Sequence, residues 1–339
     1  MLYWHRLNPV RPNGGLVVER KCAGNLFPKI EPYNSGFLNV GDGHKIYFEE
    51  CGKPEGFPVI FFHGGPGVGC TKTDRRFFNP KKWRIAFFDQ RGSGRSLPGG
   101  YVHANTARKL VGDTKTLMDS LGIEKAVFFG GSWGSTLALL CAIEYPERVS
   151  GMILRGIFLA TDEEIGEYSA GCAGKHYPES RKRFLSHVPK YRQNDVVSYY
   201  YERIFKGKNS GEKRHFAYEW ARYEEAMLCL KPKQNGLIDK ELGEYPFEQW
   251  VRIEVHYMKH GCFLPNGYIL ENSHRIAHIP TSIVQGRYDM CCPPISAFCL
   301  HNALKQSELN MVFAGHSSTD PEIRKKLVLK TEAMHEKIG

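Results

Sequence analysis

The sequence lacks the features that would direct this chain to a membrane or a secretory route. No apolar stretch in its 339 residues reaches the ~18 residues of a membrane-spanning helix. No signal-peptide pattern and no Asn-x-Ser/Thr glycosylation sequence are found. The ten cysteines include no Cys-x-x-Cys pair, and the adjacent Cys291 and Cys292 cannot easily bridge each other. These absences predict free thiols in a reducing compartment, and so a cytoplasmic protein that does not associate with membranes.

The sequence also lacks a run of basic residues interleaved with aromatic residues, which a nucleic-acid groove requires. The formal net charge is +10, with lysine and arginine spread along the chain. We interpret this charge as an aid to solubility and an attraction for acidic peptides, and we expect no nucleic-acid partner. Residues 1–24 are basic but show no clear amphipathic period, which predicts a disordered N-terminal extension. The oligomeric state stays open.

Residues 130–134 read Gly-Gly-Ser-Trp-Gly and match the Gly-x-Ser-x-Gly pattern of a nucleophile elbow. In a chain with 35 glycines, the pentapeptide alone is also compatible with a glycine-rich turn capped by serine. The flanks favour the elbow, because an apolar strand precedes it at 125–129 and a helix-forming run follows at 135–143, ending before Pro146. This setting presents the hydroxyl of Ser132 on a tight, strained turn.

Short apolar segments alternate with helical patterns through most of the chain. This alternation predicts an α/β protein with a mostly parallel central sheet that is covered by helices on both faces. A hairpin is expected at 37–50, and helices are expected at 106–121 and 321–337. The expected apolar strands lie at about 58–62, 84–88, 125–129, 149–154, 281–285 and 309–313.

Residues 160–277 differ from the rest of the chain. They are rich in charged and aromatic residues and show helical periodicity without clear strands. A connection longer than about 15 residues inside a compact domain usually carries function. We therefore predict a core domain made of residues 25–159 and 278–339, with residues 160–277 inserted into it as a helical cap domain.

Ser132 needs a base, and the base needs an acid that orients it. In the α/β-hydrolase fold the order along the chain is serine, then acid, then histidine. Asp289 follows the strand predicted at 281–285, and His316 follows the last predicted strand, so both belong at the carboxyl ends of strands, where ligands meet an open α/β sheet. We predict a Ser132–His316–Asp289 triad, which needs no metal and no cofactor. Asp89 is a weaker choice for the acid.

A triad also needs donors for the oxyanion that forms on the substrate carbonyl. The backbone N–H of Trp133 is one, because it follows the nucleophile. The second is expected from the loop after an earlier strand, where residues 63–67 read His-Gly-Gly-Pro-Gly. We select Gly65, since glycines let the backbone approach a substrate oxygen closely; the alternative is a purely structural turn. We interpret residues 89–96 as a loop that supports the site.

Several longer segments, taken together, resemble the proline iminopeptidases, which are serine exopeptidases of the α/β-hydrolase fold. The resemblance runs from about residue 25 to 325. It is carried by IEPYNSGFLNVGDGHKIYFEECG, FFHGGPG, FFDQRGSGRS, GGSWGSTLAL, YPERV, LRGIF, GRYDMCCPP and AGHSSTDPE. HGGPG, DQRGxGRS and GGSWGxTL form a highly specific combination.

The resemblance implies that the chain releases N-terminal proline from peptides through an acyl-enzyme on Ser132. It also implies two cap glutamates that hold the substrate amine, Glu224 and Glu254, and a pyrrolidine pocket lined by Phe158 and Cys292. A peptide's free amine is cationic below a pKa of about 8, so carboxylates aimed into a pocket would select it. Without the resemblance, each glutamate reads as a solvated charge on a helix face.

Two other functions remain open from the sequence. An esterase acting on small acyl esters would use the same triad, although an uncharged acyl group has no use for cap carboxylates, whose unpaired burial is costly. A non-catalytic interaction protein on a hydrolase scaffold has no need to retain Ser132, Asp289 and His316 together. An aspartate nucleophile is excluded, because Ser132 holds the elbow.

Overall fold

The computed structural model of this chain describes residues 25–338, apart from positions 171, 232, 234 and 245. The predicted extension at residues 1–24 lies outside the described residues. A single sheet forms the centre of the structure, in the order β1-β2-β4-β3-β5-β6-β7-β8. Its strands are β1 (Asn34–Asn39), β2 (Lys45–Gly52), β3 (Phe57–Phe62), β4 (Trp83–Phe88), β5 (Ala126–Ser132), β6 (Val149–Ile157), β7 (Thr281–Gly286) and β8 (Ser307–Val312).

The sheet is antiparallel at one edge and parallel elsewhere. β1 pairs with β2 and β2 with β4 in antiparallel fashion, and every pair from β4 to β8 is parallel. The predicted hairpin is therefore joined to the parallel part through β4. Because the parallel strands run in one direction, their carboxyl ends meet along one edge, where the loops after β3, β5, β6 and β7 come together.

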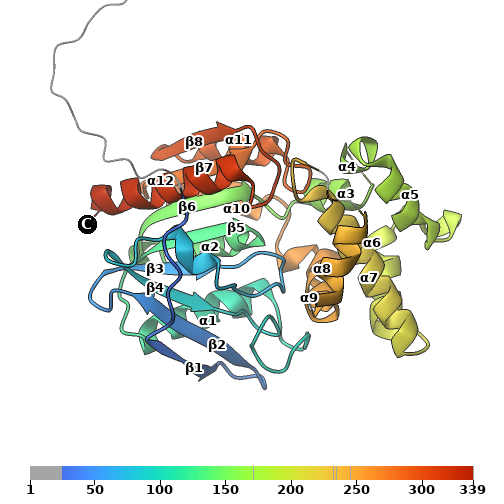
Figure 1. Ribbon diagram of the computed structural model, residues 1–339, viewed down its shortest axis with the longest axis horizontal. Helices are drawn as coiled ribbons and strands as arrows, with labels where there is room; N and C mark the ends of the chain where they lie inside the picture. Colours follow the sequence, from blue (N-terminus) through green and yellow to red (C-terminus); the bar gives the residue numbers. More distant parts are fainter. Residues whose placement is uncertain (1–24, 171, 232, 234, 245, 339) are drawn as a thin grey trace, which may run out of the picture.

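Helices cover both faces of the sheet, as expected for parallel strands (Figure 1). In β3, Ile60 and Phe62 pack in one hydrophobic cluster, while Val59 and Phe61 pack in another. This alternation places the two clusters on opposite faces. The first contains side chains of α1 (Ala107–Ser120), α2 (Trp133–Glu144) and α11 (Pro294–Ala303); the second contains those of α12 (Pro321–Ile338) and η1 (Asp74–Phe77).

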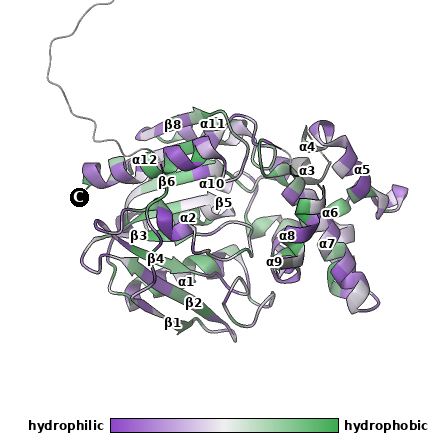
Figure 2. Ribbon diagram, in the orientation of Figure 1, coloured by the Kyte–Doolittle hydropathy of each residue, from purple (hydrophilic) through white to green (hydrophobic). Residues whose placement is uncertain are grey.

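The segment between β6 and β7 is helical throughout its described part. Figure 1 shows most of it as a group of helices beside the sheet, at the right of the view, and in Figure 2 much of α5 and α7 is hydrophilic. The helices are α3 (Asp162–Ala170), α4 (Cys172–His176), α5 (Pro178–Ser186), α6 (Val196–Lys206), α7 (Ser210–Met227), α8 (Asn235–Glu244), α9 (Phe247–Lys259) and α10 (Tyr268–Glu271).

The starts of the cap helices α6 and α7 follow from their sequences. The carboxylate of Asp195 accepts a hydrogen bond from the N–H of Ser198 at the start of α6, and Asn209 does the same for Glu212 at the start of α7. Both are the short polar side chains that favour the N-cap position. On α9, the buried residues Trp250, Val251 and Ile253 belong to the apolar stripe that packs inward.

The predicted α/β architecture with an inserted helical cap is confirmed. The predicted strands and the helices at 106–121 and 321–337 are present, with ends that shift by a few residues; the elbow strand, for example, continues to Ser132. Sequence patterns missed the antiparallel β2–β4 pairing and the short 3₁₀ turns. Among the described residues, no helix has both the length and the apolar character needed to span a bilayer.

The elbow helix provides a direct test of this packing. A Cβ built on Gly134 would lie 2.1 Å from the carbonyl oxygen of Phe62, a backbone atom that cannot turn aside. Gly134→Ala should therefore lower the free energy of unfolding by about 1–3 kcal/mol, the usual cost of overpacking. Gly112, in α1, has open space around its Cβ position, so Gly112→Ala should raise it by up to about 1 kcal/mol. Urea unfolding of both variants measures the difference; equal effects would contradict the packing described.

Candidate active site

Ser132 lies where β5 passes into α2, with a backbone φ of 58° and ψ of −131°. This left-handed φ is rare for a residue with a side chain, and it marks a strained turn. The neighbouring glycines are required by close approach, because a Cβ on Gly130 would lie 2.2 Å from the carbonyl oxygen of Gly134. The strand and helix ends thus cross in a space that only glycine fits, and the serine is held at the tip.

His316 and Asp289 meet at this edge of the sheet. Nδ1 of His316 lies 2.8 Å from Oδ2 of Asp289, and both side chains are buried. The carboxylate is fixed by further donors: the N–H groups of Cys291 and Cys292 bond Oδ1, and the amide of Gln285 bonds Oδ2. A carboxylate held by this many donors is a rigid orienter for the imidazole.

Arg155, from β6, determines how the His316 ring is protonated. Its Nη1 lies 3.1 Å from Nε2 of His316 and 2.9 Å from the carbonyl oxygen of the same residue. Because a guanidinium only donates, Nε2 must accept, and the ring proton must reside on Nδ1 facing Asp289. This is the tautomer that a general base needs. A Cβ on Gly131 would lie 2.5 Å from the Arg155 guanidinium, so the elbow glycine also makes room for the arginine.

The end of α7 holds the loop that carries the histidine. The carbonyl oxygen of Leu228 accepts hydrogen bonds from the N–H groups of His316 and Ser317, at 2.9 and 2.8 Å. The carboxylate of Asp320 accepts from the N–H groups of Gly315 and Leu230. The helical insertion and the catalytic loop are therefore joined by main-chain hydrogen bonds.

The His-Gly-Gly-Pro-Gly loop lies against the elbow. A Cβ on Gly64 would lie 3.5 Å from Cβ of Ser132, and Gly65 has a φ of 106° that favours glycine. Gln90 ties the loop in place: its side chain donates to the carbonyl oxygen of His63 and accepts from the indole N–H of Trp133. Gly65 thus follows a glycine that lies close to Ser132 and has no room for a larger side chain on that side.

Asp89 has a different role from Asp289. Its carboxylate accepts from the Arg95 guanidinium at 2.7 Å and from the N–H of Cys70 at 2.7 Å. Arg95 also contacts Glu49, which pairs with Arg75. The loop at 89–96 is therefore braced by a network of ion pairs, and the carboxylate that contacts His316 is Asp289.

Glu254 and Glu224 form a carboxyl pair in the cap. Glu254 is almost completely buried in α9 and accepts a hydrogen bond from the indole N–H of Trp220 at 3.2 Å. Burial, and next the charge and hydrogen bond of Glu224, raise the pKa of Glu254 well above its ordinary value. Two carboxyls that share a hydrogen bond hold one proton between them. The neighbouring Glu225 pairs instead with Lys233 at 2.8 Å.

Cys292 lies next to Ser132, while the backbone of Phe158 bonds to residues of α2 that follow Ser132. Sγ of Cys292 is 3.9 Å from Oγ of Ser132, and burial raises the pKa of this thiol well above its ordinary value. Phe158 follows β6 and is buried, with its N–H directed to Oγ of Ser135 and its carbonyl oxygen accepting from Thr136. The thiol next to Ser132 is therefore uncharged.

Sequence comparison shows which known proteins this chain is similar to. A family model described as alpha/beta hydrolase fold matches residues 58–321. A proline iminopeptidase of Arabidopsis thaliana is 41% identical over 320 residues, which are 93% of this chain and 83% of that protein. The chain belongs to the proline iminopeptidase family. A proline iminopeptidase of Neisseria meningitidis is likewise 41% identical over 304 residues, 89% of this chain and 96% of that protein.

Solved structures share the fold of this proline iminopeptidase family member at low sequence identity. The proline iminopeptidase of Mycobacterium smegmatis superposes with a TM-score of 0.61 at 16% identity and covers 89% of this chain and 98% of its own. An esterase of Exiguobacterium antarcticum gives 0.62 at 18% identity, covering 89% and 100%. At these identities the likeness establishes the fold alone.

Sequence patterns missed three residues of the site in this family member. Arg155 is a lone charge in an apolar strand, and that contrast was the available signal. Gln90 is polar and follows a buried strand directly, which also points to the site edge. Trp220 offered no signal of its own, because an aromatic residue on a helix is normally interpreted as core.

The carboxyl pair predicts a pH-dependent change in stability. Because the pKa of Glu254 in the folded protein lies above the unfolded value of about 4.3, the native protein binds more protons than the unfolded chain between these two pKa values. The free energy of unfolding therefore falls as the pH rises from the unfolded pKa to the folded pKa. Glu254→Gln keeps the hydrogen bonds of the protonated carboxyl and removes its titration. The variant should therefore become more stable than the parent as the pH rises from about 5 to about 9.

Thermal unfolding of both proteins across this pH range measures the effect. Glu225→Gln is the matched control, because this glutamate already has a lysine partner. A difference in melting temperature between parent and Glu254→Gln that stays constant with pH would mean that no shared proton resides on the pair.

Proposed function

We propose that this protein is a serine exopeptidase that releases N-terminal proline from peptides through an acyl-enzyme intermediate. Residues 160–277 act as a cap domain over the core domain formed by residues 25–159 and 278–339. The observation that carries the proposal is the buried carboxyl pair Glu224–Glu254. Both glutamates act electrostatically on Cys291, two residues from Asp289.

The chemistry begins at Ser132. His316 takes the hydroxyl proton on Nε2 as Oγ attacks the prolyl carbonyl carbon, and Asp289 stabilises the imidazolium that results. Before this step Nε2 faces Arg155, so the arginine must give up that contact as the serine hydroxyl turns toward the ring; catalytic hydrogen bonds commonly tighten only with substrate bound. The N–H groups of Gly65 and Trp133 bind the oxyanion.

The intermediate then resolves in two steps. When the carbon–nitrogen bond breaks, His316 gives its proton to the leaving amine, and the rest of the peptide departs with a new N-terminus. Water attacks the prolyl ester, His316 takes its proton, and proline leaves as Ser132 regains its hydrogen. No cofactor enters any of these steps.

The carboxyl pair supplies the selection for a free N-terminus. Without substrate the pair holds a shared proton; the cationic prolyl amine takes its place and satisfies both carboxylates. Phe158 and Cys292 give the pyrrolidine ring an uncharged environment next to Ser132. A residue upstream of proline would collide with the carboxylates, so only the first residue of the chain is cleaved.

The acyl-enzyme is tested on the nucleophile itself. Ser132→Ala should lower kcat by several orders of magnitude while the melting temperature stays near that of the parent, because the side chain is small and partly exposed. The parent should be labelled by a fluorophosphonate probe and the variant should not. Ser120→Ala, at the exposed end of α1, controls for loss of a serine. Normal turnover in folded Ser132→Ala protein would exclude the mechanism.

The amine clamp is tested by removing its charge without changing its shape. Charge-assisted hydrogen bonds are worth about 1.5–3 kcal/mol, so Glu254→Gln should lower kcat/KM for prolyl-naphthylamide by roughly tenfold to a hundredfold. Glu224→Gln should have a similar effect, while Glu225→Gln, its neighbour on α7, should have little. Hydrolysis of a small neutral ester should change much less in all three variants.

N-acetylation of the prolyl substrate supplies the opposing test. It removes the positive charge, and cleavage by the parent enzyme should be lost. An esterase would still accept the acetylated compound and would tolerate both glutamate substitutions. Equal losses on amine and ester substrates would assign the glutamates to cap structure and would exclude the clamp.

A further inference from the structure

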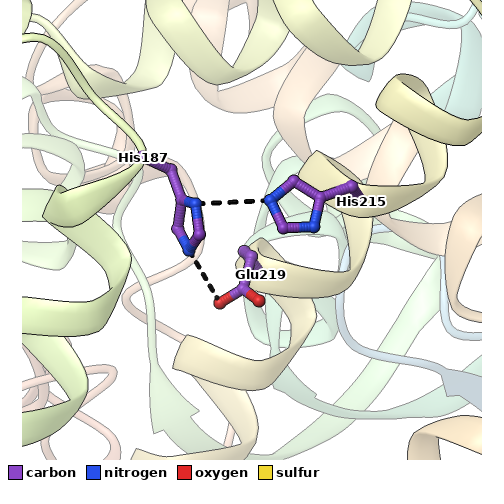
Figure 3. Close-up of side chains that lie close together, drawn as sticks. All are labelled: His187, His215 and Glu219. Carbon is purple, nitrogen blue, oxygen red and sulfur yellow. Dashed lines mark hydrogen bonds and ion pairs between the residues drawn. The ribbon is translucent and has the colours of Figure 1, made fainter.

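A second cluster of ionisable side chains lies in the cap, formed by His187, His215 and Glu219 (Figure 3). His187 follows the last residue of α5, and the other two lie four residues apart on α7, so they share one face of that helix. Figure 3 shows one nitrogen of the His187 ring directed to His215 and the other directed to Glu219. The proposed peptidase mechanism uses none of the three.

The distances suit a metal ion. Nδ1 of His187 and Nε2 of His215 face each other at 3.3 Å. Two nitrogens bound to a tetrahedral zinc ion at about 2.0–2.1 Å lie roughly 3.3–3.4 Å apart, so the two rings already have the spacing of neighbouring ligands. One ligand atom from each of the three residues falls within 4.8 Å of the others. Oε2 of Glu219 lies 3.4 Å from Nε2 of His187, on the other side of the ring, so an ion held by Nδ1 requires the Glu219 side chain to turn toward it.

The surroundings keep the ligands in the form that binds metal. Burial, with a smaller contribution from His215, lowers the pKa of His187, although Glu219 opposes this. Burial raises the pKa of Glu219, but the stronger combined effect of Arg183 and the two histidines holds it below its ordinary value, so this carboxylate is ionised. His215 is exposed, which leaves a route from solvent and room for a water ligand.

Arg183 forms an ion pair with the carboxylate of Glu219 in this structure. Its Nε and Nη2 donate to the two oxygens of Glu219 at 2.8 and 2.7 Å. The Arg183 side chain is 44% exposed, so it can move into solvent when another cation takes its place. A divalent cation and a guanidinium thus compete for the same buried carboxylate.

We propose that His187, His215 and Glu219 form a site for one divalent transition-metal ion of the zinc type, which displaces Arg183 from Glu219. Two imidazoles and a carboxylate are a ligand set that zinc accepts, with water in the fourth position. The ion would join the end of α5 to α7 at a point next to Trp220, the residue that bonds Glu254. The site is a structural staple of the cap and takes no part in peptide hydrolysis.

Titration of the metal-free, full-length protein with Zn²⁺ alone, followed by calorimetry, tests the site. Co²⁺ should bind in competition with Zn²⁺ and give the visible absorption of tetrahedral cobalt. We expect saturable binding of one equivalent, weakened at least about tenfold in His215→Ala, since even residues that only support a ligand change affinity by this much. His274→Ala, which removes an exposed histidine elsewhere, should bind as the parent does.

Arg183→Gln tests the competition. It removes the rival cation while leaving an amide donor for Glu219, so Zn²⁺ should bind more tightly than in the parent. Weaker binding in Arg183→Gln would contradict displacement.

The active site offers a second group, Asp289, Cys291 and His316, that could take up the same ion. Binding there would inhibit hydrolysis and would persist in His215→Ala. Absence of binding, or full retention of it in His215→Ala, would overturn the proposal without affecting the proposed peptidase function.

Discussion

The close crossing of backbone segments at the end of β5 governs the rest of this structure. Gly130, Gly134 and the carbonyl group of Phe62 approach so closely that no side chain fits between them. This crowding forces Ser132 into a left-handed backbone conformation and holds it at the tip of the turn. The loops after β3, β6 and β7 converge on this turn. In a more flexible turn the same residues would stay nearby, but the orientation of Ser132 relative to them would vary.

The buried carboxyl pair of the cap is energetically unfavourable. A carboxyl as deeply buried as Glu254 loses its hydration, and a second carboxyl beside it adds repulsion unless a proton is shared. Natural chains keep such unfavourable groups mainly where a ligand relieves them. In the proposed function the cationic amine of the substrate would relieve this cost by binding to both carboxylates. The indole N–H of Trp220 stabilises the pair in the meantime.

The sequence predicts the sheet well because each strand and helix has a local signature. The elbow is recognised from five residues and their flanks, and the order of Ser132, Asp289 and His316 follows from the fold. Contacts between distant segments are different. Arg155 and His316 are 161 positions apart, and nothing local marks their hydrogen bond. The same holds for Leu228, whose role depends on a carbonyl group that every residue possesses. Such contacts emerge only when the chain is folded.

The carbonyl oxygen of Leu228 accepts two hydrogen bonds that join the cap to the loop of His316. Glu224 belongs to the last turn of α7, and Leu228 follows the helix directly. The carbonyl oxygen of Leu228 accepts a hydrogen bond from the backbone N–H of His316. Swinging α7 outward to admit a bulky chain would pull on the histidine loop at the same moment. The position of the His316 backbone is therefore tied to the position of α7, and a displacement of one would be transmitted to the other.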